Sequence, residues 1–270
     1  MNDKAIGIFD SGLGGLTCVK EVIRLLPHEN IIYFGDTGRL PYGSRSPQTL
    51  YKYVTQDIRF LKQFDIKMIA IACGTASTVV LPEMEAGDVG IPMTGVVEEA
   101  AREAVRESKN KKIGVIATQA TVQSGAFERR IKAFCSDAEV FSAACPMFVP
   151  LVENGYADTE VSNIIAKEYL EPLKKEGVDT LILGCTHYPL LTKTIKNIMG
   201  EDVFLISSGE QMARYIKNYL QKNDMLSSKK KDGSCNYYVS DTTDGFEKLG
   251  SLFLGREIKG LVKRIDIEKY

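Results

Sequence analysis

The chain has almost no net charge, no closely spaced cysteine pair and no long hydrophobic run. Its 34 basic and 35 acidic side chains give a formal net charge of -1. The basic footprint of a nucleic-acid-binding protein is therefore missing, as is a field that would attract an anionic membrane. None of the six cysteines belongs to a C-x-x-C pair, which argues against a disulfide scaffold and for reduced thiols. No apolar stretch reaches the ~20 residues that span a bilayer, and the N-terminal residues are too polar for a signal sequence. We expect a cytoplasmic protein without nucleic-acid or membrane partners.

Short β-branched runs alternate with amphipathic stretches along the 270 residues, which is typical of a mostly parallel α/β sheet. Most runs are continuously apolar, as expected where helices cover both faces of a strand. Apolar residues at 3-4 spacing predict helices around residues 50–61, 164–173 and 212–219, with Pro172 bending the second or marking its end. The expected strands are residues 5–9, 31–34, 68–72, 93–97, 113–117, 140–143, 180–183, 203–206 and 237–239.

Cys73 and Cys185 each stand where an apolar strand runs into a small, hydroxyl-rich loop. Their separation is about the length of a small α/β domain, which suggests two similar halves that each offer one thiol to a shared cleft. Two thiols on opposite sides of a substrate are what a racemase without a cofactor needs, because one face must lose a proton and the other must gain one. Plain packing is the alternative for either cysteine. The other cysteines have apolar neighbours and are expected to be structural: Cys18, Cys135, Cys145 and Cys235.

Two further loops follow predicted strands, and open α/β sheets bind ligands at the carboxyl ends of their strands. The segment from Asp10 to Gly15 lacks the third glycine of a dinucleotide loop. It predicts a tight turn into a helix starting near Leu16, whose free N–H groups suit a carboxylate. The segment from Gly35 to Ser44 is rich in glycine, proline and hydroxyl groups and suits a small polar ligand. Either segment is also compatible with a plain turn.

Charged neighbours bear on both thiols, since a thiol of ordinary pKa is only a few per cent thiolate at neutral pH. His187 follows Cys185 closely and, when cationic, favours the thiolate, while Glu153 is a candidate to orient and charge His187. Asp10 opposes ionisation of Cys73 as a like charge, so its expected role is to accept the thiol proton or to hold a substrate ammonium group. The sequence has no close pairs of ligands such as a structural zinc site needs. A Cys-His hydrolase is also an unsatisfactory interpretation, because it would leave one strand-end cysteine without a role.

Five motifs occur in order along the chain. They are Ile8 to Leu16 (IFDSGLGGL), Asp36 to Ser46 (DTGRLPYGSRS), Ala117-Thr118 with Thr121-Val122, Pro150 to Glu153 (PLVE) and Gly184 to Leu190 (GCTHYPL). On these residues the chain resembles the glutamate racemases of the aspartate/glutamate racemase superfamily, almost from end to end. In such enzymes, the histidine after Cys-Thr in the last motif separates the glutamate enzymes from their aspartate-specific relatives.

The resemblance implies an α/β fold of two pseudo-symmetric domains, each a mostly parallel sheet flanked by helices, with the active site in the cleft between them. Residues 1–97 and 207–270 would form the first domain and residues 98–206 the second. It also implies an isomerase that needs neither cofactor nor metal and interconverts L- and D-glutamate by proton transfer between two cysteines. Such an enzyme would be a homodimer and would supply D-glutamate for peptidoglycan synthesis, and so for cell wall biogenesis and cell shape.

The resemblance further implies roles for single residues. Cys73 and Cys185 would be the acid/base pair, with Asp10 supporting Cys73 and with His187 and Glu153 supporting Cys185. The residues expected to contact the substrate are Asp10, Ser11, Pro41, Tyr42, Gly43, Gly74, Thr75, Thr121, Thr186 and His187.

Gly74 departs from the family pattern, in which most relatives carry asparagine at this position. The missing amide removes a contact to the substrate, and an unmet hydrogen bond costs on the order of 1–3 kcal/mol. We therefore expect catalysis to survive, with an effect on affinity and selectivity.

Three other functions compete with glutamate racemisation. Racemisation of aspartate or another acidic amino acid on the same scaffold is permitted by Gly74 and disfavoured by His187. A pyridoxal-phosphate racemase would leave both thiols idle. A binding role is the third, since some relatives inhibit DNA gyrase; here the first predicted strand already begins at Ala5, and no surface motif points to such a partner.

Overall fold

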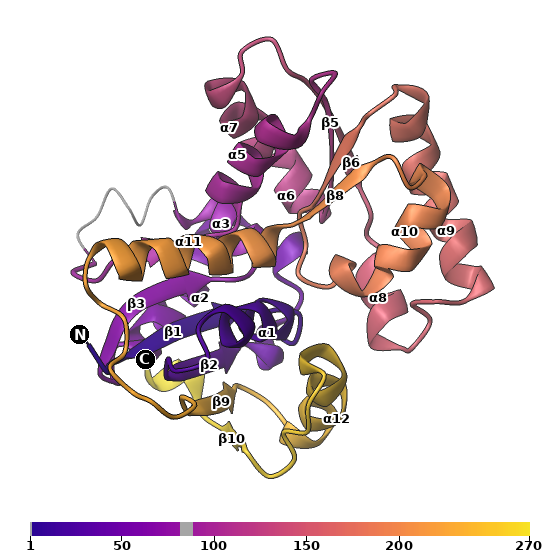
Figure 1. Cartoon of the computed structure of the whole chain (residues 1–270). Helices are drawn as coiled ribbons and strands as arrows, with labels where there is room; N and C mark the ends of the chain where they lie inside the picture. Colours follow the sequence, from indigo (N-terminus) through magenta and orange to yellow (C-terminus); the bar gives the residue numbers. More distant parts are fainter. Residues whose placement is uncertain (1, 82–88) are drawn as a thin grey trace.

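Two all-parallel β-sheets, each flanked by helices, make up the computed structural model, which describes residues 2–81 and 89–270 (Figure 1). Sheet A has the strand order β10-β9-β2-β1-β3-β4 and sheet B the order β6-β5-β7-β8. The strands of sheet A are β1 (Ala5–Asp10), β2 (Ile31–Gly35), β3 (Ile66–Ile71), β4 (Met93–Thr94), β9 (Cys235–Val239) and β10 (Val262–Arg264). Those of sheet B are β5 (Lys112–Ala117), β6 (Glu139–Ala144), β7 (Thr180–Leu183) and β8 (Phe204–Ser207).

The helices alternate with these strands along the chain. The α-helices are α1 (Leu16–Leu25), α2 (Pro47–Leu61), α3 (Gly74–Val79), α5 (Val97–Glu107), α6 (Gln119–Gln123), α7 (Ala126–Phe134), α8 (Phe148–Glu153), α9 (Glu160–Lys175), α10 (Thr192–Met199), α11 (Ser208–Lys222) and α12 (Thr243–Leu254). The 3-10 helices are η1 (Thr37–Arg39), η2 (Tyr42–Ser44), η3 (Tyr188–Leu191) and η4 (Ile267–Lys269).

The central strands are buried along their whole length, which explains their continuous apolar runs. Every residue of β1, β3 and β7 is buried, because helices cover both faces of a parallel sheet. The edge strands β6 and β8 are more exposed. One core cluster runs from sheet A through α11 to sheet B, and the other two clusters lie on the remaining faces.

Both sheets begin with the same arrangement of three strands. In sheet A, β2 and β3 lie on opposite sides of β1, and in sheet B, β6 and β7 lie on opposite sides of β5. The strand order therefore reverses between β1 and β3 and again between β5 and β7, and ligands bind at such switch points. The third strand of each set leads directly into one of the strand-end cysteines.

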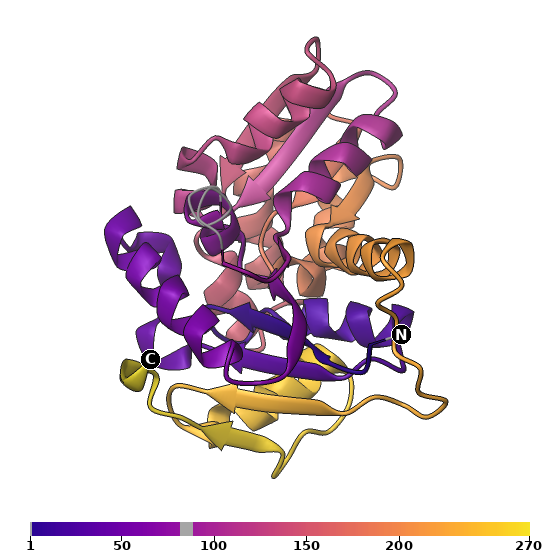
Figure 2. The same cartoon turned by 90° about the vertical axis from the view of Figure 1, so that its left-hand side faces the viewer.

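The two sheets form two lobes with α11 between them. In Figure 1, β1, β2, β3 and β9 lie below α11, and β5, β6 and β8 lie above it. Helix α11 starts directly after β8 and packs against α1 of the lower lobe and α5 of the upper one. Figure 2 shows the same division from the side, with both chain ends at the lower lobe. The division into domains at residues 97/98 and 206/207 stays our proposal.

The predicted fold class is confirmed, and local deviations from the predicted elements have physical reasons. The expected strand at residues 93–97 is wrong beyond Thr94, since Gly95 interrupts it and Val97 begins α5, whose first turn carries Glu98 and Glu99. Pro172 does not end α9, which continues to Lys175. Strand β10 was not predicted, because its short sequence Val-Lys-Arg has no apolar pattern.

None of the described helices combines the length and the apolar character needed to cross a membrane.

Candidate active site

A cavity of about 470 Å³ lies between the two lobes, at the carboxyl ends of the strands of both sheets. This volume suits a small molecule. From the sheet A lobe it is lined by Ser11, Leu40, Pro41, Tyr42, Gly43, Ser44, Cys73, Gly74 and Thr75. From the sheet B lobe it is lined by Thr118, Gln119, Pro146, Val149, Pro150, Glu153, Gly184, Cys185, Thr186 and His187. The two strand-end cysteines thus face one cavity from different sheets.

Cys73 directly precedes α3 and is buried. Burial raises the pKa of its thiol to about 11, and the negative charge of Asp10 acts in the same direction. Hydrogen bonds from Ala76 and Ser11 oppose the shift. At this pKa the thiol of Cys73 is neutral at pH 7.

Cys185 is the corresponding thiol of the other lobe. Burial raises its pKa, while the backbone amide of His187 opposes that shift. Its Sγ lies 4.0 Å from Nδ1 of His187, and Nε2 of the same ring lies 2.9 Å from Oε1 of Glu153. The ring of Phe253 packs edge-on against the imidazole, with 5.3 Å between ring centroids. Cys185, His187 and Glu153 thus contact one another in sequence along the cavity wall.

Asp10 lies behind the cavity wall rather than in it. Its Oδ2 accepts a hydrogen bond of 3.0 Å from the amide of Gly12. Its Oδ1 is buried and has no hydrogen-bond partner among the described residues. Burial raises the pKa of Asp10, and the electrostatic interaction with His187 and the nearby backbone amides oppose this. A buried acceptor without a partner is costly, so Oδ1 is suited to accept a proton or a hydrogen bond from an incoming group.

Hydroxyl groups connect the two lobes around the cavity. Thr75 Oγ1 lies 3.1 Å from Thr118 Oγ1, which in turn donates to Thr121 Oγ1 at 3.0 Å. On the other side, Thr17 Oγ1 donates to the carbonyl oxygen of Thr186 at 2.8 Å. These contacts close the cleft and leave polar groups at its edge.

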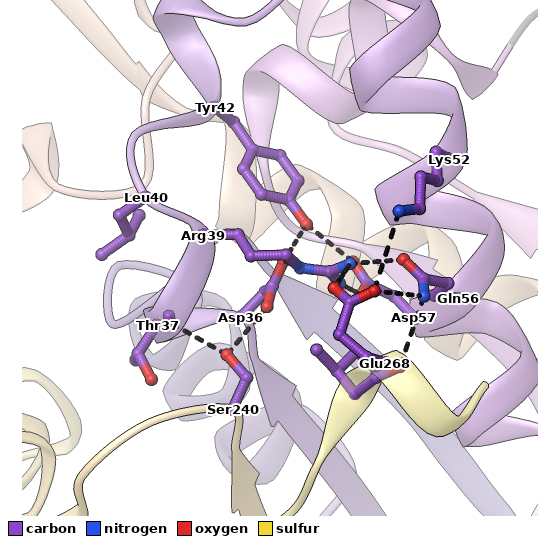
Figure 3. Close-up of polar contacts among 12 residues, drawn as sticks. Asp36, Thr37, Arg39, Leu40, Tyr42, Lys52, Gln56, Asp57, Ser240 and Glu268 are labelled. Carbon is purple, nitrogen blue, oxygen red and sulfur yellow. Dashed lines mark hydrogen bonds and ion pairs between the residues drawn. The ribbon is translucent and has the colours of Figure 1, made fainter.

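A buried polar network holds the loop that carries Tyr42 and Gly43 (Figure 3). Arg39 Nε donates to Asp36 Oδ2 at 2.6 Å, and its Nη2 donates to Asp57 Oδ1 at 2.8 Å. Tyr42 Oη lies 2.5 Å from Asp36 Oδ2 and 2.9 Å from Asp57 Oδ2. The hydroxyl of Tyr42 is therefore engaged away from the cavity, which leaves its ring and backbone for a ligand.

The network contains more acceptors than a single phenol proton can serve. A phenol carries one proton to donate, so Asp36 and Asp57 share the single donor of Tyr42. Burial raises the pKa of Asp57 well above its usual value, and the charge of Asp36 adds to the shift. The charge of Arg39 and the hydrogen bond that Tyr42 donates oppose this shift.

The structure brings most of the expected site residues to one cavity. Asp10 and Thr121 lie just behind its wall, and every other expected residue lines it. Their chemical roles stay predictions. Thr118 was missed as a site residue, although it stands directly after β5 as Cys185 stands near the end of β7. Asp57 was missed too; its signal is an acidic residue on the apolar face of α2, in line with Val54 and Leu61.

All six cysteines are free thiols. Of those expected to be structural, Cys18 and Cys145 are buried, and Cys135 and Cys235 are half-buried. Within residues 2–81 and 89–270, no three His, Cys, Asp or Glu side chains gather in a way that would hold a metal ion.

Comparison with protein families and curated proteins identifies similar chains. The family model described as Asp/Glu/Hydantoin racemase matches residues 16–216. The glutamate racemase of Geobacter metallireducens is 44% identical over 265 residues, which are 98% of this chain and 97% of that protein.

Solved structures are similar over the same extent. A glutamate racemase isoform from Bacillus anthracis superposes with a TM-score of 0.94 at 39% identity, covering 98% of each chain. The glutamate racemase of Francisella tularensis, solved in complex with D-glutamate, has a TM-score of 0.92 at 34% identity and full coverage of both chains. The likeness thus includes both lobes.

Proposed function

The chain belongs to the Asp/Glu/Hydantoin racemase family, and from this premise we propose that it interconverts L- and D-glutamate by using Cys73 and Cys185 as a pair of acid/base groups. Its full-length relatives are glutamate racemases, which are isomerases. The observation that carries the mechanism is that the two thiols reach one cavity from matching strand ends of two separate sheets.

In the proposed reaction, one thiolate takes the α-proton from one face of glutamate, and the thiol opposite gives a proton to the other face. The electron pair of the broken Cα–H bond stays on the α-carbon until the new C–H bond forms. The two cysteines exchange roles in the reverse direction. No other bond is made or broken.

Ionisation of a buried thiol needs a compensating charge, because burial raises the pKa of both thiols. The ammonium group of glutamate supplies a positive charge next to the thiols and favours the thiolate. Asp10 Oδ1 is the free acceptor for that ammonium group or for the proton of Cys73. On the other side, His187 exchanges the proton of Cys185, and Glu153 orients its ring.

The carboxylates of glutamate need donors in a site from which water is excluded. We assign this role to hydroxyl groups and backbone amides at the cavity wall. They belong to Ser11, Tyr42, Gly43, Thr75, Thr118 and Thr186.

The test is circular dichroism of the protein mixed with D-glutamate, in reducing agent and without added cofactor. We expect the signal to decay to zero, and we expect Cys73→Ser and Cys185→Ser each to lower the rate by about 100- to 10,000-fold, since a positioned acid/base group typically contributes this much. A flat trace with the wild type would contradict the proposed substrate. Turnover near that of the wild type in either variant would contradict the two-thiol mechanism.

Two finer statements follow from the family and form part of the same proposal. The D-glutamate produced would enter peptidoglycan synthesis, and the protein would act as a homodimer. Light scattering on the eluting peak of a gel-filtration column measures the second: a mass near twice the 29.9 kDa of the chain is expected, and a mass of one chain contradicts it.

A further inference from the structure

The ring of His187 belongs to the sheet B lobe but lies against the first loop of the sheet A lobe. His187 follows β7, whereas Gly14 lies between β1 and α1. A Cβ atom on Gly14 would lie closer than 3.0 Å to Oγ1 of Thr186 and to Nδ1 and Cε1 of His187, which real Cβ atoms essentially never do. The backbone of Gly14 is therefore packed directly against the two side chains that follow Cys185.

The backbone conformation of Gly14 does not itself require glycine. Its φ lies outside the left-handed region, so alanine can adopt the same conformation. The neighbouring Gly15 differs, because a Cβ atom there would meet Asp10 and Tyr33 of its own lobe. At Gly14 the space is taken by the other lobe, and specifically by Thr186 and His187.

The two loops are held together by the hydroxyl group of Thr17. Its Oγ1 donates to the carbonyl oxygen of Thr186 at 2.8 Å and lies 2.9 Å from the carbonyl oxygen of Gly14. The amide of Thr17 also donates to the Gly14 carbonyl at 3.0 Å. An added Cβ atom is therefore accommodated more easily by rotation of the two side chains than by separation of the two backbones.

Rotation of the His187 ring would disturb its contact with the thiol. Nδ1, which lies 4.0 Å from Sγ of Cys185, is one of the atoms that a Cβ on Gly14 would meet. Nε2 is held at 2.9 Å by Glu153, and Phe253 packs edge-on against the ring. A ring displaced by an added Cβ therefore loses the alignment between Cys185 and Glu153.

We propose that Gly14 is a positioning residue, whose lack of a side chain leaves the space in which the His187 ring lies beside the Cys185 thiol. The proposal rests on the proposed two-thiol racemisation and deepens it, because the sheet A lobe then helps to prepare the thiol of the sheet B lobe. To reach an ordinary contact distance of ~3.5 Å, the ring would have to move by about 1 Å. A misplacement of that size lowers a rate by as much as about 100-fold.

The first experiment measures racemisation of glutamate by Gly14→Ala. We expect kcat to fall about 10- to 100-fold, because His187 no longer exchanges the proton of Cys185 efficiently. The matched control is Gly245→Ala in the first turn of α12, where an added Cβ atom meets nothing within 4 Å. Its kcat should equal that of the wild type.

A double-variant cycle tests whether the effect acts through His187. In a His187→Ala protein the ring is absent, so the further change Gly14→Ala should lower kcat by no more than about threefold. If Gly14 acted independently of the ring, the two effects would multiply.

The second experiment uses a reaction that needs only one thiol. With 3-chloroglutamate, one thiolate takes the α-proton, the Cα–H electron pair forms a double bond to the β-carbon, and chloride leaves with the electrons of its bond. The resulting enamine tautomerises and is hydrolysed by water to 2-oxoglutarate and ammonium. The two enantiomers present the α-proton to opposite thiols, and the one whose chloride release is lost in Cys185→Ser is the one that uses Cys185.

Gly14→Ala should affect the two enantiomers differently. We expect chloride release from the enantiomer that uses Cys185 to slow about 10- to 100-fold. Release from the enantiomer that uses Cys73 should stay within about threefold of the wild type, since His187 does not act on that thiol.

The outcomes separate the two proposals. A wild type that does not racemise glutamate, or equal slowing of both enantiomers in Cys185→Ser, contradicts the proposed function itself. With an active wild type, kcat of Gly14→Ala within about twofold overturns the role of Gly14. Equal slowing of both enantiomers by Gly14→Ala, multiplied effects in the double variant, or loss of the folded circular dichroism spectrum would assign Gly14 to general structure and overturn the role as well.

Discussion

The carboxyl group of Asp57 supports the loop at residues 41–44 through its hydrogen bonds. Its protonation therefore affects the stability of the protein. This carboxyl group lies fully buried beside Arg39 and Tyr42, and the side chain of Asp36 faces the same phenol. Beyond these, Gln56 bonds Arg39, and exposed Glu268 approaches the guanidinium at 3.6 Å. Arg39 thus bonds both carboxyl groups, Asp36 at 2.6 Å and Asp57 at 2.8 Å.

The first prediction concerns the stability of Asp57→Asn as a function of pH. The pKa of Asp57 is raised in the folded state, so folding retains a proton that the unfolded chain loses above ~3.9. The stability that this proton contributes is complete below that pH and is lost as the pH rises towards the folded pKa. Asparagine cannot ionise. The unfolding free energy of the wild type should therefore fall relative to that of Asp57→Asn by up to about 1.4 kcal/mol per pH unit.

Urea unfolding at pH 5, 7 and 9 measures this difference. Asp65→Asn is the control, because Asp65 is exposed and pairs with Lys4 on the surface. Its difference from the wild type should not vary with pH. A constant difference for Asp57→Asn would show that Asp57 is ionised in the folded protein.

A second buried ion pair joins several elements at the opposite end of β3. Lys67 Nζ lies 2.5 Å from Glu29 Oε2, and both side chains are buried. The same ammonium group donates to the carbonyl oxygens of Asn2 and Met225, each at 2.7 Å. The ammonium group of Lys67 thus holds four segments together: the N-terminal segment, β3, the turn before β2 and the end of α11.

The second prediction is that Lys67→Met lowers the free energy of unfolding by about 3–5 kcal/mol, because it leaves Glu29 buried without a counter-charge. Changing Glu29 to Leu in the same protein should restore much of the loss. Lys4→Met, which removes an exposed pair, should cost less than about 1 kcal/mol. Urea unfolding provides the values, and kcat should stay unchanged because the pair lies far from the strand ends that carry the thiols. A small effect of Lys67→Met would mean that water reaches this pair.

The whole molecule consists of two lobes with one cavity between them. The third prediction is that D-glutamate stabilises the inactive Cys73→Ser protein against thermal unfolding, since a ligand that binds only the folded state adds about 2.7 kcal/mol at 100 times its dissociation constant. D-Lysine serves as the control of similar size and the wrong side-chain charge. Equal shifts with both ligands, or none with D-glutamate, would contradict recognition of two carboxylates by the cavity.

Local patterns in the chain account for much of this architecture. Continuous apolar runs are properties of neighbouring residues, so the parallel sheets and the positions of Cys73 and Cys185 after their strands were predictable. A short polar strand such as β10 was not, because its pairing with β9 supplies what its sequence lacks. The prediction that the strand continues to Val97 was wrong for the opposite reason. The β-branched run favours a strand, but Glu98 and Glu99 favour the start of a helix there.

What the residues alone determined is the chemistry available: two strand-end thiols, a histidine near one of them and a loop rich in small residues. What only the tertiary structure decided is how these groups act on one another. The raised pKa of Asp57 depends on its burial beside the charge of Asp36, and the approach of Cys73 and Cys185 to one cavity depends on the way the two lobes meet. Protonation and close approach both depend on groups that are distant in sequence, and folding alone brings these groups together.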